Sequence, residues 1–195
     1  MPATDAFQIL ALAGSYRSGS YNQALIAAAR ELAPGGVEIV DFDLRTVPHY
    51  DGDLEAAGDP EPVQALKQAV RDSDALLVVT PEYNSGVPGV LKNGIDWSSR
   101  VYPEAPIADK LAAIIGATPG RSGTKFAQEQ VRQLLGRTGA VVIDGPGLML
   151  AQAGDMIENG TVTSDAIRDQ LAAVLESIVR TAERCAETGS SAVAG

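Results

Sequence analysis

The sequence predicts an α/β fold built on a doubly wound parallel sheet, because short apolar runs alternate with helical patterns from end to end. The runs are hydrophobic at consecutive positions, which indicates strands that helices cover on both faces. Each run ends in turn or loop residues. Right-handed crossovers between such strands place helices on both sides of a five-stranded sheet, and a ligand is expected at the carboxyl ends of the strands.

The five expected strands are runs rich in Ile, Leu, Val or Ala. In chain order they are Phe7–Ala13, Val37–Phe42, Ala75–Thr80, Leu111–Ala117 and Ala140–Ile143. The helical patterns between and after them are Tyr21–Leu32, Pro62–Asp72, Pro88–Arg100, Thr124–Arg137 and Ser164–Cys185. The last helix repeats apolar residues at spacings of four, four and three, which predicts a stripe facing the sheet: Ile167, Leu171, Leu175 and Ile178.

The chain has 195 residues, a length typical of one domain with a complete apolar core. We expect a single domain over residues 1–185 and a flexible C-terminal tail over residues 186–195, which are rich in Gly, Ser and Ala. One cysteine, Cys185, allows no internal disulfide, and the first residues lack the pattern of a signal peptide. We therefore expect a cytoplasmic protein. No apolar run approaches the ~20 residues of a membrane helix.

The net charge argues against polyanionic partners. With 15 basic and 25 acidic side chains the charge is −10, and the segment 38–61 alone carries eight acidic residues against one arginine. Binding of nucleic acid or of an anionic membrane requires a basic face, so neither partner is expected. The acidic segment itself is typical of a solvated surface.

The loop after the first expected strand, residues 14–22, is suited to a phosphate. Its glycines let the backbone approach an anion, and the following helix offers free N–H groups at its positive end. Ser15, Ser20 and Asn22 add neutral donors, and Arg17 is the only charged side chain. An ordinary Ser/Asn helix cap is the competing interpretation.

The same loop does not match the better-known nucleotide motifs. Ser20 stands where a P-loop requires lysine, and no G-x-G-x-x-G follows the first strand. A Ser-His-Asp hydrolase is disfavoured as well, because the chain has one histidine, His49, and no G-x-S-x-G. No His/Cys cluster suggests a metal. A phosphomonoester held by many hydrogen bonds suits the loop best.

The loop after the third expected strand predicts a flat binding surface. Pro81 and Pro88 stiffen its two ends, and Tyr83 between them offers a ring for packing against a planar group. The backbone amides of Tyr83 and Asn84 are expected to face the rim of such a group. Alternatively, Tyr83 simply covers the core.

These two loops together resemble the NAD(P)H-dependent FMN reductases of the flavodoxin-like fold, which include bacterial quinone and chromate reductases. The similarity is carried by G-S-x-R-x-x-S-x-N at residues 14–22 and by P-E-Y-N-x-x-x-P-G-x-L-K-N-x-I-D-W at residues 81–97. The resemblance implies strand order 2-1-3-4-5, FMN as cofactor, NADPH or NADH as co-substrate, and a homodimer or homotetramer. It implies that the FMN phosphate is held by Ser15, Arg17, Ser20 and Asn22 with Tyr21 beside them, and that the ring is lined by Pro81, Glu82, Tyr83, Asn84 and Ser85.

The sequence departs from the family pattern at two glycines and in one loop. Many relatives have Ser at Gly86 and Ala at Gly94, and a mid-helix glycine predicts local loosening or a close helix contact. The loop after the fourth strand is glycine-rich, as in the family, but its sequence differs from the family pattern. Within it, Thr118 and Gly120 are expected to reach the ring edge, and Arg121 to meet the flavin or a nicotinamide phosphate.

In a flavoenzyme the cofactor carries the chemistry, so no catalytic side chain is assigned. The expected reaction is a ping-pong cycle in which NAD(P)H reduces FMN and leaves before a small-molecule acceptor binds: a quinone, chromate, an azo compound or free flavin. One alternative is a flavodoxin-like electron carrier whose acidic surface docks a redox partner. Another is a flavin-free nucleotide-binding module.

Overall fold

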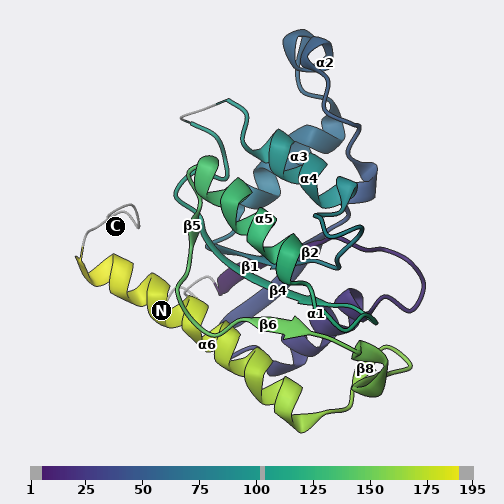
Figure 1. The fold of residues 1–195 in the computed structure, drawn as a ribbon. Helices are drawn as coiled ribbons and strands as arrows, with labels where there is room; N and C mark the ends of the chain where they lie inside the picture. The colour runs from purple at the N-terminus through teal and green to yellow at the C-terminus, as the bar shows by residue number, and fades with distance from the viewer. Residues whose placement is uncertain (1–5, 102–103, 189–195) are drawn as a thin grey trace.

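The computed structural model describes residues 6–101 and 104–188. They form three layers, in which a parallel sheet lies between two layers of helices (Figure 1). The main strands are β1 (Phe7–Ala13), β2 (Val37–Phe42), β3 (Ala75–Val79), β4 (Leu111–Ala117) and β5 (Val141–Val142). They pair in the order β2-β1-β3-β4-β5, all in parallel. This order is that of the flavodoxin-like doubly wound fold, so the predicted class and order are confirmed.

The fifth position in the sheet is shared by two short strands. β5 pairs with Leu111 and Ala112 at the start of β4, and β6 (Leu148–Leu150) pairs with residues 115–117 at its end. The expected strand Ala140–Ile143 is therefore shorter than predicted, and β6 was not predicted. Residues 144–147 between the two strands are exposed. Their sequence, Asp-Gly-Pro-Gly, is typical of a turn and interrupts the strand.

Five long helices follow the predicted pattern, and their bounds differ from it by a few residues at most. They are α1 (Tyr21–Leu32), α3 (Glu61–Asp72), α4 (Gly89–Ser98), α5 (Lys125–Arg137) and α6 (Asp165–Thr188). Several short elements were not predicted from the sequence pattern: the 3₁₀ turns η1 (Leu44–Thr46) and η2 (Ala153–Asp155), the helix α2 (Gly52–Ala57) and the antiparallel pair β7 (Ile157–Glu158) and β8 (Thr161–Val162).

The sheet separates two apolar cores. Alternate residues of each central strand point to opposite faces, so that Ile9 packs with α1 and α6 whereas Leu10 packs with α3, α4 and α5. Figure 1 shows α6 and α1 on one side of the sheet and the other three helices on the opposite side. The stripe predicted on α6 lies in the first core. Helices on both faces explain the continuous hydrophobicity of the strands.

Helix α6 continues to Thr188, three residues beyond the predicted end at Cys185. Residues 186–188 of the expected tail are thus helical, and residues 189–195 lie outside the described residues. Within the described ranges no helix has the length and apolar character needed to cross a lipid bilayer.

Gly94 makes the close helix contact that its position predicted. A Cβ at this position would lie 2.7 Å from Cδ2 of Leu44 in η1. The glycine therefore lets α4 approach the turn after β2, and the buried Leu44 fills the space that a methyl group would take.

Candidate cofactor-binding site

A pocket of about 230 Å³ lies at the carboxyl ends of β1, β3 and β4, where the doubly wound fold predicts a ligand. All three predicted loops contribute to it. Its lining comprises Ser15, Arg17, Ser20, Tyr21, Asn22, Pro81, Glu82, Tyr83, Ala117, Thr118 and Pro119. The structure thus brings together most of the predicted site residues. The others, Asn84, Ser85, Gly120 and Arg121, lie outside this lining.

The start of α1 forms the end of the pocket that is suited to an anion. Ser20 is its N-cap, and its hydroxyl accepts a hydrogen bond from the Gln23 N–H (3.4 Å) and donates to the Ser15 carbonyl (3.4 Å). The first turn of α1 carries no acidic side chain. The positive end of the helix therefore faces the pocket without an internal carboxylate to neutralise it.

Gly14 lets the first two loops touch. A Cβ on Gly14 would lie 2.8 Å from Cδ of Pro81 and 3.1 Å from Cγ of Pro88. The Gly14 N–H also donates to the Val79 carbonyl at the end of β3 (2.9 Å). Any larger residue at position 14 would separate the phosphate loop from the Pro81 loop.

Asn22 is buried and joins α1 to β4. Its Nδ2 donates to the Ala117 carbonyl (2.9 Å), and its Oδ1 accepts from the Ala117 N–H (3.0 Å). Both bonds are made by the last residue of β4, where the backbone would otherwise lack a partner. Asn22 therefore lines the pocket while its amide is committed mainly to the protein backbone.

Arg17 lies on the exposed rim of the same pocket. Its Nη1 donates to the carbonyls of Ser18 (3.3 Å) and Gly19 (3.0 Å), and its guanidinium lies 5.3 Å from the ring centroid of Tyr21. Neutral carbonyls and an aromatic face are its partners in this arrangement, so its charge remains available to an anion.

Tyr16 is a supporting residue that the sequence analysis missed. Its hydroxyl donates to the Phe42 carbonyl (3.0 Å) and accepts from the Leu44 N–H (3.0 Å), which ties the phosphate loop to the end of β2. Burial raises the pKa of Tyr16 to about 12. Aromatic residues in loops are common, so the sequence offered no signal for this role.

Residues 83–86 form a tight hairpin. The Tyr83 N–H donates to the Gly86 carbonyl (3.1 Å), and the Gly86 N–H donates back to Tyr83 (2.9 Å). Asn84 and Ser85 occupy the turn with φ values of 50° and 59°. This is the left-handed geometry of a two-residue hairpin turn. The expectation that the Tyr83 amide faces a ligand is wrong, because this N–H is used inside the hairpin.

Tyr83 contributes a half-exposed aromatic ring to the pocket. Its side chain is part of the lining, the residue is 50% exposed, and its hydroxyl donates to Oγ of Ser15 (3.4 Å). A half-exposed aromatic face next to the phosphate loop can pack against a planar group. The alternative that Tyr83 merely covers the core does not fit this exposure.

Glu82 lines the pocket, but its carboxylate serves as the cap of α5. Oε2 accepts hydrogen bonds from the N–H groups of Phe126 (2.8 Å) and Ala127 (3.1 Å). The amides and positive end of α5 compensate the charge of this carboxylate. An anion in the pocket is therefore not opposed by an uncompensated Glu82.

The third loop of the pocket, which follows β4 and begins at Thr118, forms the wall that we call the third wall. It is held by a segment that the sequence pattern did not connect to the site. The Thr118 N–H donates to the Leu150 carbonyl (3.0 Å), and the Ala153 N–H donates to the Thr118 carbonyl (3.0 Å). Two residues after Thr118, the Gly120 carbonyl accepts a hydrogen bond from the Gln152 N–H (2.9 Å). The end of β6 and η2 thus fix the loop that contains Thr118.

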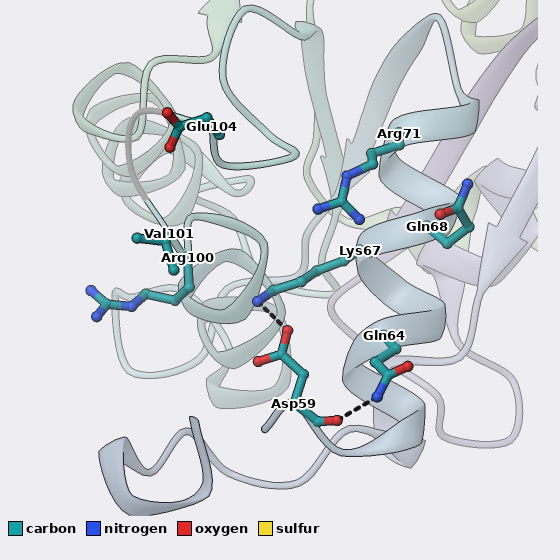
Figure 2. A pocket seen from close by; sticks show the side chains of 8 residues that line it. All are labelled: Asp59, Gln64, Lys67, Gln68, Arg71, Arg100, Val101 and Glu104. Atoms are coloured by element: carbon teal, nitrogen blue, oxygen red, sulfur yellow. Dashed lines mark hydrogen bonds and ion pairs between the residues drawn. The ribbon is translucent and has the colours of Figure 1, made fainter. Parts of the chain in front are cut away.

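A different pocket of about 450 Å³ shares no residue with the cofactor-binding site. Figure 2 shows that it lies between α3 and the chain after α4, and that the Arg100 side chain points away from the others. Lys67 is buried and pairs with the Asp59 carboxylate (2.5 Å), while Arg100 pairs with Glu55 (2.9 Å). Lys67 and Arg100 therefore have carboxylate partners, and none of the predicted site residues lines this pocket, so we place the candidate ligand site in the first pocket.

The fold defines a flavodoxin-like α/β protein, and its pocket offers donors suited to an anion beside an exposed aromatic ring. Comparison with known proteins agrees. The model of the NADPH-dependent FMN reductase family matches residues 7–155. An NAD(P)H-dependent FMN reductase of Pseudomonas aeruginosa is 39% identical over 176 residues, which cover 90% of this chain and 95% of that protein.

Two further relatives point the same way. A quinone reductase of Escherichia coli K12 is 35% identical over 187 residues, covering 91% of this chain and 98% of that protein. The structure of FerB, a flavoenzyme NAD(P)H:(acceptor) oxidoreductase from Paracoccus denitrificans, superimposes with a TM-score of 0.82 at 34% identity, covering 91% of this chain and 97% of that chain.

The chain belongs to the NADPH-dependent FMN reductase family. The predicted class, a flavin-dependent oxidoreductase that uses FMN and NAD(P)H, is thereby confirmed, and the electron-carrier alternative is not favoured.

Proposed function

We propose that this pocket holds FMN with its phosphate at the start of α1 and its ring against the Pro81 loop. The main support for this proposal is that one pocket brings together three features. They are the hydroxyls of Ser15 and Ser20, the positive end of α1 and the half-exposed ring of Tyr83. The donor set fits FMN, because it offers neutral donors and one arginine for a phosphate and an aromatic face for a planar ring. The single carboxylate in the lining is already bonded to α5.

In this proposal the residues of the lining and their neighbours in the three loops have different roles. Ser15, Ser20 and Arg17 bind the phosphate, and Asn22 holds α1 against β4 so that these donors converge. Pro81, Glu82, Tyr83, Asn84 and Ser85 form the loop beside the ring. Thr118, Gly120 and Arg121 belong to the loop after β4, in which Gly120 and Arg121 are exposed.

When bound, FMN supplies the redox chemistry by accepting a hydride from NAD(P)H and passing the electrons to the acceptor. The protein binds and orients the reactants. The N–H groups at the start of α1 stabilise negative charge in the pocket. His49 is exposed and is not part of the lining, so it takes no part in proton transfer at this site.

Among the expected acceptors we propose a quinone. The names of two relatives with extensive coverage support this choice: the quinone reductase of Escherichia coli and a 2-hydroxy-1,4-benzoquinone reductase of a Burkholderia species, which is 36% identical over 167 residues. A flat aromatic acceptor also suits the exposed ring of Tyr83 at the pocket mouth.

We further propose that the chain up to the end of α6 at Thr188 acts as one FMN-binding domain, three residues longer than expected, and that the enzyme works in the cytoplasm as a homodimer or homotetramer. Neither nucleic acid nor a membrane is proposed as a partner. Support comes from the absence of a basic face expected from the charge of −10 and from the low cysteine content.

The test is to purify the protein, reconstitute it with FMN and record its visible absorbance. We expect a yellow protein that NAD(P)H bleaches without oxygen and that a benzoquinone then recolours. A colourless protein that cannot be reconstituted would overturn the proposal. A yellow protein that NAD(P)H does not bleach would support the electron-carrier alternative instead.

A further inference from the structure

The hairpin that carries Tyr83 is held from outside by one side chain of α5. Gln130 Oε1 accepts a hydrogen bond from the Val87 N–H (3.1 Å), and its Nε2 donates to the Ser85 carbonyl (3.2 Å). The amide thus bridges the residues on either side of Gly86. Neither bond belongs to the secondary structure of α5 or of the hairpin itself.

Gly86 makes this bridge possible. A Cβ at position 86 would lie 3.3 Å from Gln130 Oε1 and 3.8 Å from its Nε2, so the amide rests directly over the bare glycine. The contact at 3.3 Å is tighter than an ordinary van der Waals contact. The departure from the family pattern at Gly86 therefore has a structural counterpart on α5.

A second bond joins the same loop to the same helix. Glu82, at the base of the hairpin, accepts from the first N–H groups of α5, while Gln130 is one turn further along the helix and holds the tip. Two attachments fix the orientation of the hairpin, whereas one would leave it free to pivot. Tyr83 lies between them with its hydroxyl on Ser15.

We propose that Gln130 is a positioning residue that sets the Tyr83 ring at the mouth of the cofactor pocket. The inference rests on the proposed FMN site. Gln130 is absent from the pocket lining and acts through the hairpin only. It therefore affects how tightly the ring of the cofactor is held and how fast electrons pass to the acceptor, without touching either reactant.

The decisive variants are Gln130→Met, which keeps the length of the side chain and removes both hydrogen bonds, and Gln130→Glu, which keeps the acceptor for Val87 and loses the donor to Ser85. Gln133→Met is the matched control, because Gln133 is exposed on the same helix and lies outside the hairpin contact. Gly86→Ala probes the same contact from the other side, since its Cβ pushes the Gln130 amide away.

We expect Gln130→Met to raise the Kd for FMN about three- to tenfold, as for the loss of two exposed neutral hydrogen bonds, and to change the visible circular dichroism of the bound flavin. Gln130→Glu and Gly86→Ala should fall between Gln130→Met and the wild type. Gln133→Met should match the wild type. In a Tyr83→Ala background the effect of Gln130→Met on the Kd should largely disappear, because the ring it positions is gone.

Three outcomes overturn the inference: an unchanged Kd and flavin spectrum in Gln130→Met, an equal effect in Gln133→Met, or an undiminished effect in the Tyr83→Ala background. The melting temperature of each apoprotein shows whether a variant is folded. Failure of the proposed function looks different, because the wild type itself would then neither bind FMN nor be bleached by NAD(P)H.

Discussion

Asn22 and Ala117 pair through two hydrogen bonds of 2.9 and 3.0 Å, in which one side-chain amide satisfies both the N–H and the carbonyl of the last residue of β4. The Asn22 amide thus takes the place that the backbone of a neighbouring strand would have in the hydrogen-bond pattern of the sheet. It also fixes the distance between the start of α1 and the end of β4, which form two sides of the pocket. The residue that the sequence marked as a phosphate ligand is thus first of all a structural link.

Replacing Asn22 is expected to lower both stability and FMN affinity. Asn22→Ala leaves a buried N–H and a buried carbonyl without partners, which costs about 2–4 kcal/mol in the free energy of unfolding. Urea unfolding of the apoprotein measures this loss, and fluorescence titration measures FMN binding. An apoprotein as stable as the wild type would contradict the structural role.

Arg17→Ala should separate binding from stability. Arg17 is exposed, and its partners among the described residues are carbonyls of its own loop and the face of Tyr21, so the free energy of unfolding should change little. Loss of a charge-assisted contact should raise the Kd for FMN about tenfold or more, with less difference at high salt.

Arg180→Ala is the matched control, since Arg180 is an exposed arginine of α6 paired with Glu176 and is absent from the cofactor-pocket lining. It should leave the Kd unchanged. Equal FMN affinity in Arg17→Ala and the wild type would remove Arg17 from the phosphate site.

Stability should fall at alkaline pH partly because of Tyr16. Its pKa, raised by burial to about 12, exceeds the ordinary value of 10, so folding favours the protonated phenol. The contribution is complete below pH 10 and is lost as the pH rises towards 12, by about 1–2 kcal/mol once solvent screening of the partly exposed side chain is included.

Tyr16→Phe removes this titration along with the two hydrogen bonds to the end of β2. We expect a variant that is less stable than the wild type at pH 8 and loses less stability between pH 10 and 12. Urea unfolding at a series of pH values checks this, and parallel curves for the two proteins would show that Tyr16 does not carry the alkaline loss.

His49→Ala should leave turnover nearly unchanged. The residue is exposed, lies in the acidic segment after η1 and is not in the lining of the cofactor pocket. Stopped-flow measurement of flavin bleaching by NAD(P)H tests this directly. A marked loss of the reductive rate with FMN still bound would instead identify His49 as a proton donor.

The sheet and its flanking helices were predictable because their signals are local. Consecutive apolar residues mark strands covered on both faces, and β1 and α1 begin and end where the pattern predicts. The two-residue β5 and the unpredicted β6 show the limit of such signals, because a strand of two or three residues has no periodicity and exists only through its pairing with β4.

The residue types at the site were predictable, whereas their hydrogen-bond partners were not. Glu82 and Asn22 were both expected beside a ligand, yet their side chains bond to α5 and to Ala117, which lie 44 and 95 residues away in sequence. Partners this distant depend on tertiary packing. The support given by Tyr16 and Gln130 was missed for the same reason.

The split fifth position of the sheet has a consequence for the order in which the enzyme matures during synthesis. The strands β1, β3 and β4 are complete once Ala117 has been made, but the carbonyls and N–H groups that fix the Thr118 loop belong to residues 150–153. A nascent chain that ends before Leu150 lacks the groups that hold the Thr118 loop. Under the proposed FMN site, we expect such a chain to bind the cofactor more weakly than the complete protein.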